Sequence, residues 1–239
     1  MYHLILYRSF VSFFNFNDNI NFSLKLFLIS IAIRYNSNMT THLFVRSCYT
    51  LLDSTIRIPE LVSTAKKYGY KSVALTDHHV MHGVARFLHE CKKEGIHPII
   101  GLEVDVFYHE HKFPFLLLAK NNKGYTNLIK LSSILCDGRE YATYEELLQY
   151  CEHNFLIVYG EGGYFDAELI SEDRTGITQK LAQMKSELPS FDIAISYEET
   201  SLWRSKNALL KALANAQGIH TVAVNKIYYL GQKDYETLK

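Results

Sequence analysis

A short stretch of the chain gathers one aspartate and three histidines, in the order Asp77, His78, His79 and His82. Carboxylate and imidazole groups are common ligands of divalent metal ions, so this cluster is a candidate metal site. The apolar run Val73–Leu75 precedes it and is typical of a buried strand. Sites in α/β folds form at the carboxyl ends of parallel strands, which is where this cluster falls. It can hold a metal only if further ligands converge on it from elsewhere in the chain.

From residue 39 onward the sequence alternates between strand patterns and helix patterns. The fold that these elements form decides which further side chains can reach the Asp77–His82 cluster. The expected strands are 42–47, 72–77, 97–108, 113–120, 155–160, 191–196 and 220–225. The expected helices are 58–70, 83–95, 124–135, 143–151, 177–188, 209–218 and 233–239. The polar segment 109–112 reads as a hairpin between two of the strands. Seven strands with helices between most of them predict an α/β domain, best matched by a parallel seven-stranded barrel.

Charge and cysteine usage narrow the class of protein. The 239 residues carry 25 basic and 25 acidic side chains, so the formal net charge is zero. An independent nucleic-acid-binding module would usually be basic, and this balance gives no support for one. Cys48, Cys91, Cys136 and Cys151 form no C-x-x-C pair, which favours free thiols in a reducing compartment.

The first 38 residues differ in composition from the rest. They hold nine Phe or Tyr and six Asn but only four charged residues. The apolar run 24–33 is too short for a membrane span, which needs about 20 apolar residues. We therefore expect 1–38 to be a non-native or disordered hydrophobic extension, with Met39 starting a single domain over 39–239. A genuine hydrophobic tail or anchor is the alternative.

Long segments of the chain support a family resemblance. The run HLFVRSCYTLLDS at 42–54, the run SVALTDHH at 72–79 and the run HPIIGLEVDVFY at 97–108 occur in a characteristic order. In order and spacing they resemble the start of the bacterial DNA polymerase III alpha subunit, of the error-prone Gram-positive type. The resemblance implies a PHP (polymerase and histidinol phosphatase) domain with a distorted (β/α)7 barrel related to the TIM barrel. It also implies that the polymerase palm, fingers and thumb lie further along a parent chain, and that this sequence ends before the palm.

In metal-binding members of that family, nine residues at the barrel mouth hold three metal ions that activate water for phosphoester hydrolysis. Matched to that pattern, this sequence keeps Asp53, His78 and Glu103, and Glu161 is a possible substitute at a fourth position. These four are remnant ligand positions.

Other ligand positions are replaced by residues that do not suit a metal. They are Phe44, Arg46, Pro114, Lys226 and Tyr228. Since Arg46 and Lys226 would bring fixed cations into the mouth, we expect them to form ion pairs with the leftover carboxylates.

This matching predicts a site without catalytic residues and without metal. His78 is expected to be a hydrogen-bonded structural residue, and His79 and His82 are expected at the surface or the start of a helix. We therefore interpret the chain as a non-catalytic structural domain of a DNA polymerase III alpha subunit. The nucleotidyltransferase activity and its Mg²⁺ would belong to the parent polymerase.

The resemblance also implies partners and a location. The expected partners are the polymerase core of the same parent chain and other replisome subunits, with DNA reached only through the parent polymerase. A cytoplasmic location without membrane contact is expected. The alternative function is a stand-alone metal-dependent phosphoesterase of the PHP superfamily using Zn²⁺ or Mn²⁺. The letters DHH at 77–79 also occur in another phosphoesterase family, but its further aspartate motifs are not found.

Overall fold

The computed structural model describes residues 41–159, 164–171, 173–196, 201–231 and 234. The predicted extension 1–38 and the candidate ligand Glu161 lie outside these residues, and so does most of the helix expected at 233–239. The domain boundary at Met39 therefore stays a prediction.

Nine strands and seven helices are assigned within the described residues. The strands are β1 (Phe44–Val45), β2 (Ser72–Leu75), β3 (His97–Tyr108), β4 (His111–Ala119), β5 (Ala142–Thr143), β6 (Asn154–Val158), β7 (Phe191–Ile195), β8 (Thr221–Ala223) and β9 (Lys226–Ile227). The helices are α3 (Ile58–Lys67), α4 (Val84–Glu94), α5 (Asn122–Leu135), α6 (Tyr144–Tyr150), α7 (Tyr164–Ser171), α8 (Arg174–Glu187) and α9 (Ser201–Ala216).

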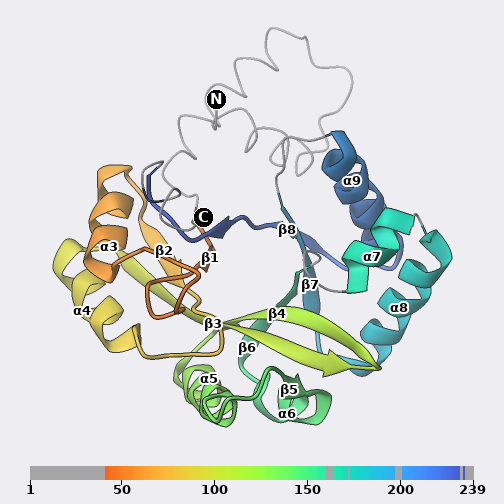
Figure 1. Ribbon diagram of the computed structural model, residues 1–239, viewed down its shortest axis with the longest axis horizontal. Helices are drawn as coiled ribbons and strands as arrows, with labels where there is room; N and C mark the ends of the chain where they lie inside the picture. Colours follow the sequence, from red (N-terminus) through yellow and green to blue (C-terminus); the bar gives the residue numbers. More distant parts are fainter. Residues whose placement is uncertain (1–40, 160–163, 172, 197–200, 232–233, 235–239) are drawn as a thin grey trace, which may run out of the picture.

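The strands follow a curled path with helices on its outside (Figure 1). The main sheet has the order β2-β3-β4-β6-β7-β8, and β5 pairs with the outer end of β3. β1 pairs with β9 and also lies along β2, since Thr76 N donates to Val45 O at 2.9 Å. Only residues 224–225 separate β8 from β9, so this short segment connects the far edge of the sheet back to β1. Because the sheet is curled, one face of β3 points toward the inside of the barrel and the other toward the surrounding helices.

The sheet is mixed, which corrects the expectation of an all-parallel barrel. β4 is antiparallel to both β3 and β6, while β2–β3, β6–β7 and β7–β8 are parallel. β3 and β4 are antiparallel because only two residues connect them, and so short a connection can join only antiparallel strands. Its residues His109 and Glu110 have φ of 43° and 66°. The α/β class and the barrel-like curl are confirmed.

Alternation along β3 separates the core from the mouth of the barrel. Leu102, Val104 and Val106 are fully buried in the largest apolar cluster, which also includes residues of α5, α6 and α8. Because successive strand residues point to opposite faces, Glu103 and Asp105 point to the opposite, inner face. The apolar face of β3 is thus held by helices, and its acidic face is left for the site.

Helix ends follow ordinary sequence signals. α4 ends at Gly95, which takes the left-handed φ of 72° expected of a helix-ending glycine. Thr143 and Glu146 form a capping box at the start of α6. The short helix α7 is not among the expected helices, because the glycine pair 162–163 just before it indicates a turn. No helix within the described residues is long and apolar enough to span a membrane.

We predict that Gly101→Ala destabilises the domain by about 1–3 kcal/mol through overpacking. A Cβ at this position would lie 2.6 Å from the backbone oxygen of Leu117 and 2.7 Å from Thr76 Cγ2. The measurement is the free energy of unfolding by denaturant titration. Gly231→Ala is the matched control, because its Cβ would meet only the Asp234 carboxylate, at 3.5 Å. Equal stability of the two variants would contradict the prediction.

Candidate functional site

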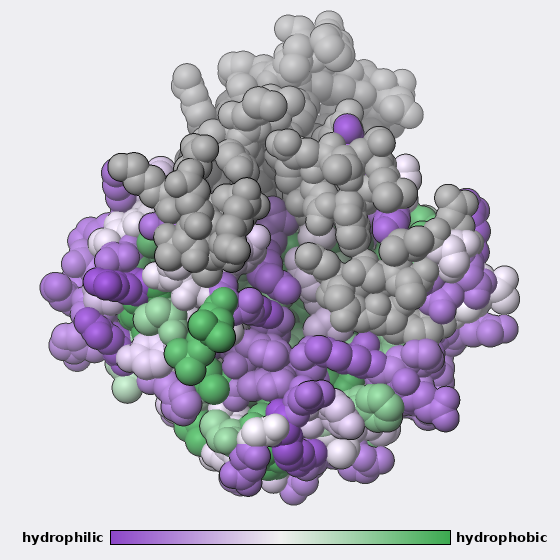
Figure 2. Space-filling model, in the orientation of Figure 1, coloured by the Kyte–Doolittle hydropathy of each residue, from purple (hydrophilic) through white to green (hydrophobic). Residues whose placement is uncertain are grey.

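Eight residues line a cleft of about 190 Å³ at the mouth of the barrel. They are Arg46, Asp53, His78, Glu103, Asp105, Lys112, Pro114 and Lys226. Six of the eight were named from the sequence, and Asp105 and Lys112 were not. The lining holds three Lys or Arg and three Asp or Glu, so its fixed charges balance. Hydrophilic residues predominate around the middle of the visible face in Figure 2, below the grey atoms.

A buried ion pair forms one side of this cleft. Arg46, directly after β1, donates from Nε and Nη2 to the two carboxylate oxygens of Glu103, both at 2.6 Å. The Arg46 and Glu103 side chains are only 11% and 4% exposed. The remaining terminal nitrogen of Arg46 forms an ion pair with Asp53, whose side chain is half exposed. One guanidinium therefore binds both carboxylates that the sequence matched to metal ligands.

Lys226 takes a different position from the one expected. Among the described residues it forms no ion pair with Asp53 or Glu103. Its Nζ lies 5.2 Å from the ring centroid of Phe44 and 5.4 Å from that of Tyr159, within the range of cation–π attraction. Phe44 is fully buried and meets Tyr159 edge to face at 5.1 Å. Phe44 is the residue that the sequence matched to the first histidine of the family pattern.

The loop after β1 is held by a buried carboxylate. Asp77 accepts from Ser47 N at 2.6 Å, from Ser47 Oγ at 2.8 Å and from Thr50 Oγ1 at 2.9 Å. Burial raises the pKa of Asp77, outweighing the opposing effect of these hydrogen bonds. Ser54 Oγ, at the end of the loop, lies 2.7 Å from Arg46 O and 3.0 Å from Tyr228 O. Asp77 is thus a structural residue that positions the loop carrying Asp53.

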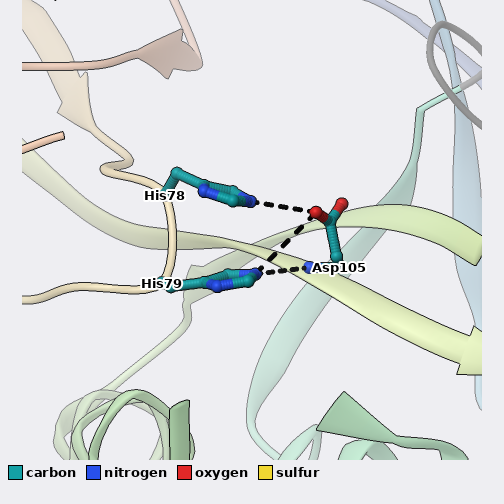
Figure 3. A group of neighbouring side chains, drawn as sticks. All are labelled: His78, His79 and Asp105. Atoms are coloured by element: carbon teal, nitrogen blue, oxygen red, sulfur yellow. Dashed lines mark hydrogen bonds and ion pairs between the residues drawn. The ribbon is translucent and has the colours of Figure 1, made fainter. Parts of the chain in front are cut away.

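His78, His79 and Asp105 meet on the other side of the cleft (Figure 3). The two imidazole rings are stacked, with centroids 3.7 Å apart. His78 Nε2 lies 3.1 Å from the Asp105 carboxylate, and Asp105 N donates to His79 Nε2 at 3.1 Å. The expectation of a hydrogen-bonded His78 fits this geometry. His79 is not a surface residue, since its side chain is only 13% exposed, whereas His82 is exposed as expected.

Backbone geometry explains how two consecutive histidines reach one aspartate. Successive side chains of a strand alternate in direction, but His79 has a left-handed φ of 62°. Its N–H donates to Glu103 O at 2.8 Å, and its carbonyl accepts from Ser132 Oγ of α5 at 2.8 Å. The left-handed turn therefore brings the His79 ring to the same side as His78.

Burial, hydrogen bonds and neighbouring charges together set the pKa values of Asp105 and His79. Lys112 Nζ, from β4, lies 2.7 Å from the Asp105 carboxylate. Burial acts to raise the pKa of Asp105, but the hydrogen bonds from His78 and Lys112 outweigh it and lower the pKa. Burial lowers the pKa of His79 to about 4, and the neighbouring His78 acts in the same direction. At neutral pH the cleft therefore holds an ionised Asp105 and a neutral His79.

His78, His79 and Asp105 are also the group among the described residues that could hold a metal ion, since their ligand atoms lie within 4.8 Å of one another. The donor set does not fit this role. His79 Nε2 already accepts a backbone hydrogen bond, so Nδ1 carries the proton of the neutral ring. The same oxygen of Asp105 accepts from both His78 and Lys112. A divalent ion would have to displace an ammonium group and break two hydrogen bonds.

Asp105 and Lys112 could have been found from the sequence by one signal. Asp105 follows Glu103 by two positions in a segment read as a strand, and period-two spacing places both side chains on one face. Lys112 pairs with Phe107 in the antiparallel register, two positions along from the Asp105–Pro114 pair and therefore on the same face as Asp105. The left-handed φ of His79 had no such signal, because a positive φ is uncommon for any residue other than glycine.

Comparison with known proteins identifies relatives of this chain. The chain matches the PHP domain family over residues 42–199. The DNA polymerase III subunit alpha of Halalkalibacterium halodurans is 36% identical over 204 residues, covering 84% of this chain and 18% of that protein. The Bacillus subtilis protein of the same name is 36% identical over 209 residues, covering 83% of this chain and 18% of that protein. The chain thus spans less than a fifth of the length of these relatives.

Solved structures share the fold at low sequence identity. An amidohydrolase from Chromobacterium violaceum, solved with sulfate and no metal, has a TM-score of 0.58 and 13% identity, covering 81% of this chain and 89% of that one. A candidate metal-dependent phosphoesterase from Bifidobacterium adolescentis has a TM-score of 0.54 and 10% identity, covering 79% of this chain and 87% of that one. At these identities the likeness shows the fold alone. The family match extends over more than half of the sequence, and on that ground this chain belongs to the PHP domain family.

Proposed function

We propose that this chain acts as the PHP domain of a DNA polymerase III alpha subunit, and that it is a structural domain whose cleft works without metal. The observation that carries the metal-free part is the pairing of Arg46 with both Glu103 and Asp53. A guanidinium that binds two carboxylates supplies the positive charge that metal ions would otherwise supply. Asp105 is neutralised in the same way by Lys112.

The proposed role has consequences for partners and chemistry. Similarity to two DNA polymerase III alpha subunits supports a place beside a polymerase core and within a replisome. Nucleotidyl transfer with Mg²⁺ would then belong to the rest of the parent protein, and DNA would be reached through it. We place this activity in the cytoplasm, where replication of a bacterial chromosome occurs. No residue of the cleft is assigned a catalytic role.

A stand-alone metal-dependent phosphoesterase is the second candidate. The observation in its favour is the group formed by His78, His79 and Asp105, whose ligand atoms lie within 4.8 Å of one another. Against it stand the ammonium of Lys112 and the guanidinium of Arg46, because fixed cations oppose the binding of a divalent ion. The two candidates differ in metal content and in hydrolytic activity.

We predict that the purified chain, incubated with Zn²⁺ or Mn²⁺ and then dialysed, retains well below one equivalent of metal. Metal is measured by elemental analysis, and hydrolysis of a chromogenic phosphodiester is measured in parallel and should be absent. Arg46→His removes a competing cation and adds a ligand, so this variant should retain more metal than the parent chain. Two or three tightly bound ions per chain, with turnover lost in His78→Ala, would instead establish the phosphoesterase.

Loss of the arginine should destabilise the domain. We predict that Arg46→Ala lowers the free energy of unfolding by about 3–5 kcal/mol, because Glu103 is left buried without its partner. The double variant Arg46→Met with Glu103→Leu should recover much of this loss, since no charge is then stranded. Stability is measured by denaturant titration.

An exposed ion pair provides the control for this measurement. Lys66 and Glu94 lie 2.8 Å apart, and the Lys66 side chain is 56% exposed. Lys66→Ala should cost only about 0–1 kcal/mol, as is typical of surface pairs. An Arg46→Ala variant no less stable than Lys66→Ala would refute the structural role of the buried pair.

The neutral state of His79 predicts a pH dependence of stability. Its pKa is about 4 in the folded chain, against 6.5 for a histidine in an unfolded chain, so between these values the unfolded chain binds more protons. The stabilisation is complete above pH 6.5 and is lost as the pH falls toward 4, at up to about 1.4 kcal/mol per pH unit. The charged or titratable groups that act on His79 are His78, Asp105, Lys112 and Arg46.

Variants separate His79 from other titrating groups. His79→Gln keeps a hydrogen-bond acceptor for Asp105 N but cannot take up a proton, so stability between pH 4 and 6.5 should become less dependent on pH. His82→Gln is the matched control, since His82 is an exposed histidine nearby. An unchanged pH profile in His79→Gln would show that His79 does not carry this effect.

A further inference from the structure

A second pocket is lined by residues from the end of β3, from β5 and from the start of α6. These elements lie side by side in Figure 1. The volume of the pocket is about 310 Å³, and its lining is largely aromatic. The lining residues are Phe107, Tyr108, His109, Tyr141, Thr143, Tyr144 and Glu145. None of these residues lines the cleft between Arg46 and Lys226 described above. The proposed function concerns that cleft and gives this pocket no role.

Exposed rings form the wall of this pocket. Phe107 and Tyr141 are stacked with centroids 5.1 Å apart and planes inclined by 30°. Their exposed fractions are 43% and 41%, which is high for large aromatic residues. Tyr108 and Tyr144 lie deeper, with centroids 4.9 Å apart. The pocket thus offers the exposed rings of Phe107 and Tyr141 to a ligand, and the faces of such rings attract cations.

The Tyr108 ring already illustrates this chemistry within the chain. Lys180 Nζ, from α8, lies 5.7 Å from its centroid. The polar end of Tyr108 is occupied as well, since its hydroxyl donates to Glu187 at 2.6 Å. His109 Nε2 also contacts Glu187, at 2.9 Å. These partners hold the inner part of the pocket in a fixed geometry.

Glu145 supplies a carboxylate at the pocket that is not used elsewhere in the described chain. Among the described residues, its side chain is in no ion pair. The neighbouring Glu146 binds both terminal nitrogens of Arg139 at 2.7 and 2.8 Å and also completes the capping box with Thr143. The start of α6 therefore has its cap without Glu145, whose negative charge is available to a ligand.

We propose that this pocket binds an arginine side chain of a partner polypeptide. A planar guanidinium stacks on aromatic faces and forms paired hydrogen bonds with a carboxylate, so it uses both Phe107–Tyr141 and Glu145. An anion would be repelled by Glu145, and a purely apolar segment would leave this carboxylate without a partner. The proposal is independent of whether the cleft binds metal.

The test uses the full chain and two small probes. N-acetyl-arginine amide is titrated while the aromatic ring signals of Phe and Tyr are followed by NMR. N-acetyl-citrulline amide, which is planar but uncharged, is the comparison. We expect saturable shifts with the arginine probe and binding about tenfold weaker with the citrulline probe, as expected when cation–π attraction and an ion pair are both lost.

Two variants locate the binding. Glu145→Gln should weaken the arginine probe about threefold or more, and Tyr141→Leu should weaken it while changing an exposed position that tolerates substitution. Glu60→Gln is the matched control, because Glu60 is also an acidic residue in the first turn of a helix, and it should leave binding unchanged. Circular dichroism checks that each variant is folded.

Three results would overturn the proposal. They are no saturable shift with the arginine probe, equal binding of the citrulline probe, and equal binding by Glu145→Gln and Glu60→Gln. Equal binding of the uncharged probe would mean that the rings stack on planar groups without selecting a cation.

Discussion

The buried ion pair between Arg46 and Glu103 is the interaction on which the geometry of the cleft depends. It joins the residue after β1 to the middle of β3, across the end of β2, with both charges almost fully removed from water. Neither group can lose the other without leaving a stranded charge. Because arginine stays protonated at any pH at which the protein folds, this neutralisation is permanent. Asp53 then binds the remaining guanidinium nitrogen, which places the loop between β1 and α3 over the mouth.

A gap in the hydrogen-bond ladder of β3 explains why His79 has a structural role. β3 pairs with β2 over residues 97–100 and with β5 over 106–107, which leaves its intermediate edge to other groups. Glu103 uses backbone groups of Asp77 and His79 there, and Asp105 N uses the His79 imidazole. One side chain thus replaces part of a strand. The left-handed backbone of His79 is the strained element that this arrangement requires, at an expected cost of about 1–3 kcal/mol.

The sequence predicted the positions of strands and helices better than the direction in which neighbouring strands pair. Strand and helix segments were recognisable because β3, β4 and α5 have clear periodicity and clear ends. The antiparallel course of β4 followed from the hairpin at 109–112, although the strand count alone suggested a parallel barrel. In the site, the convergence of Arg46 and Glu103 came from the family resemblance, since residues 57 positions apart carry no local signal of contact. The position of His79 could not be predicted, because it depends on one backbone dihedral and on the unfilled edge of β3.

The fold is shared by proteins whose sequences differ widely from this one. Solved structures with 10% and 13% identity to this chain share its fold, which depends on apolar strand faces covered by helices. The inner face of β3 carries the site: Glu103 pairs with Arg46 and Asp105 with Lys112 in the cleft, and Phe107 follows on the same face at the second pocket. Two residues of a strand span about 7 Å, so these three positions form one line. A rigid strand with buried apolar residues on its opposite face therefore fixes the spacing between a charge-balanced cleft and an aromatic pocket.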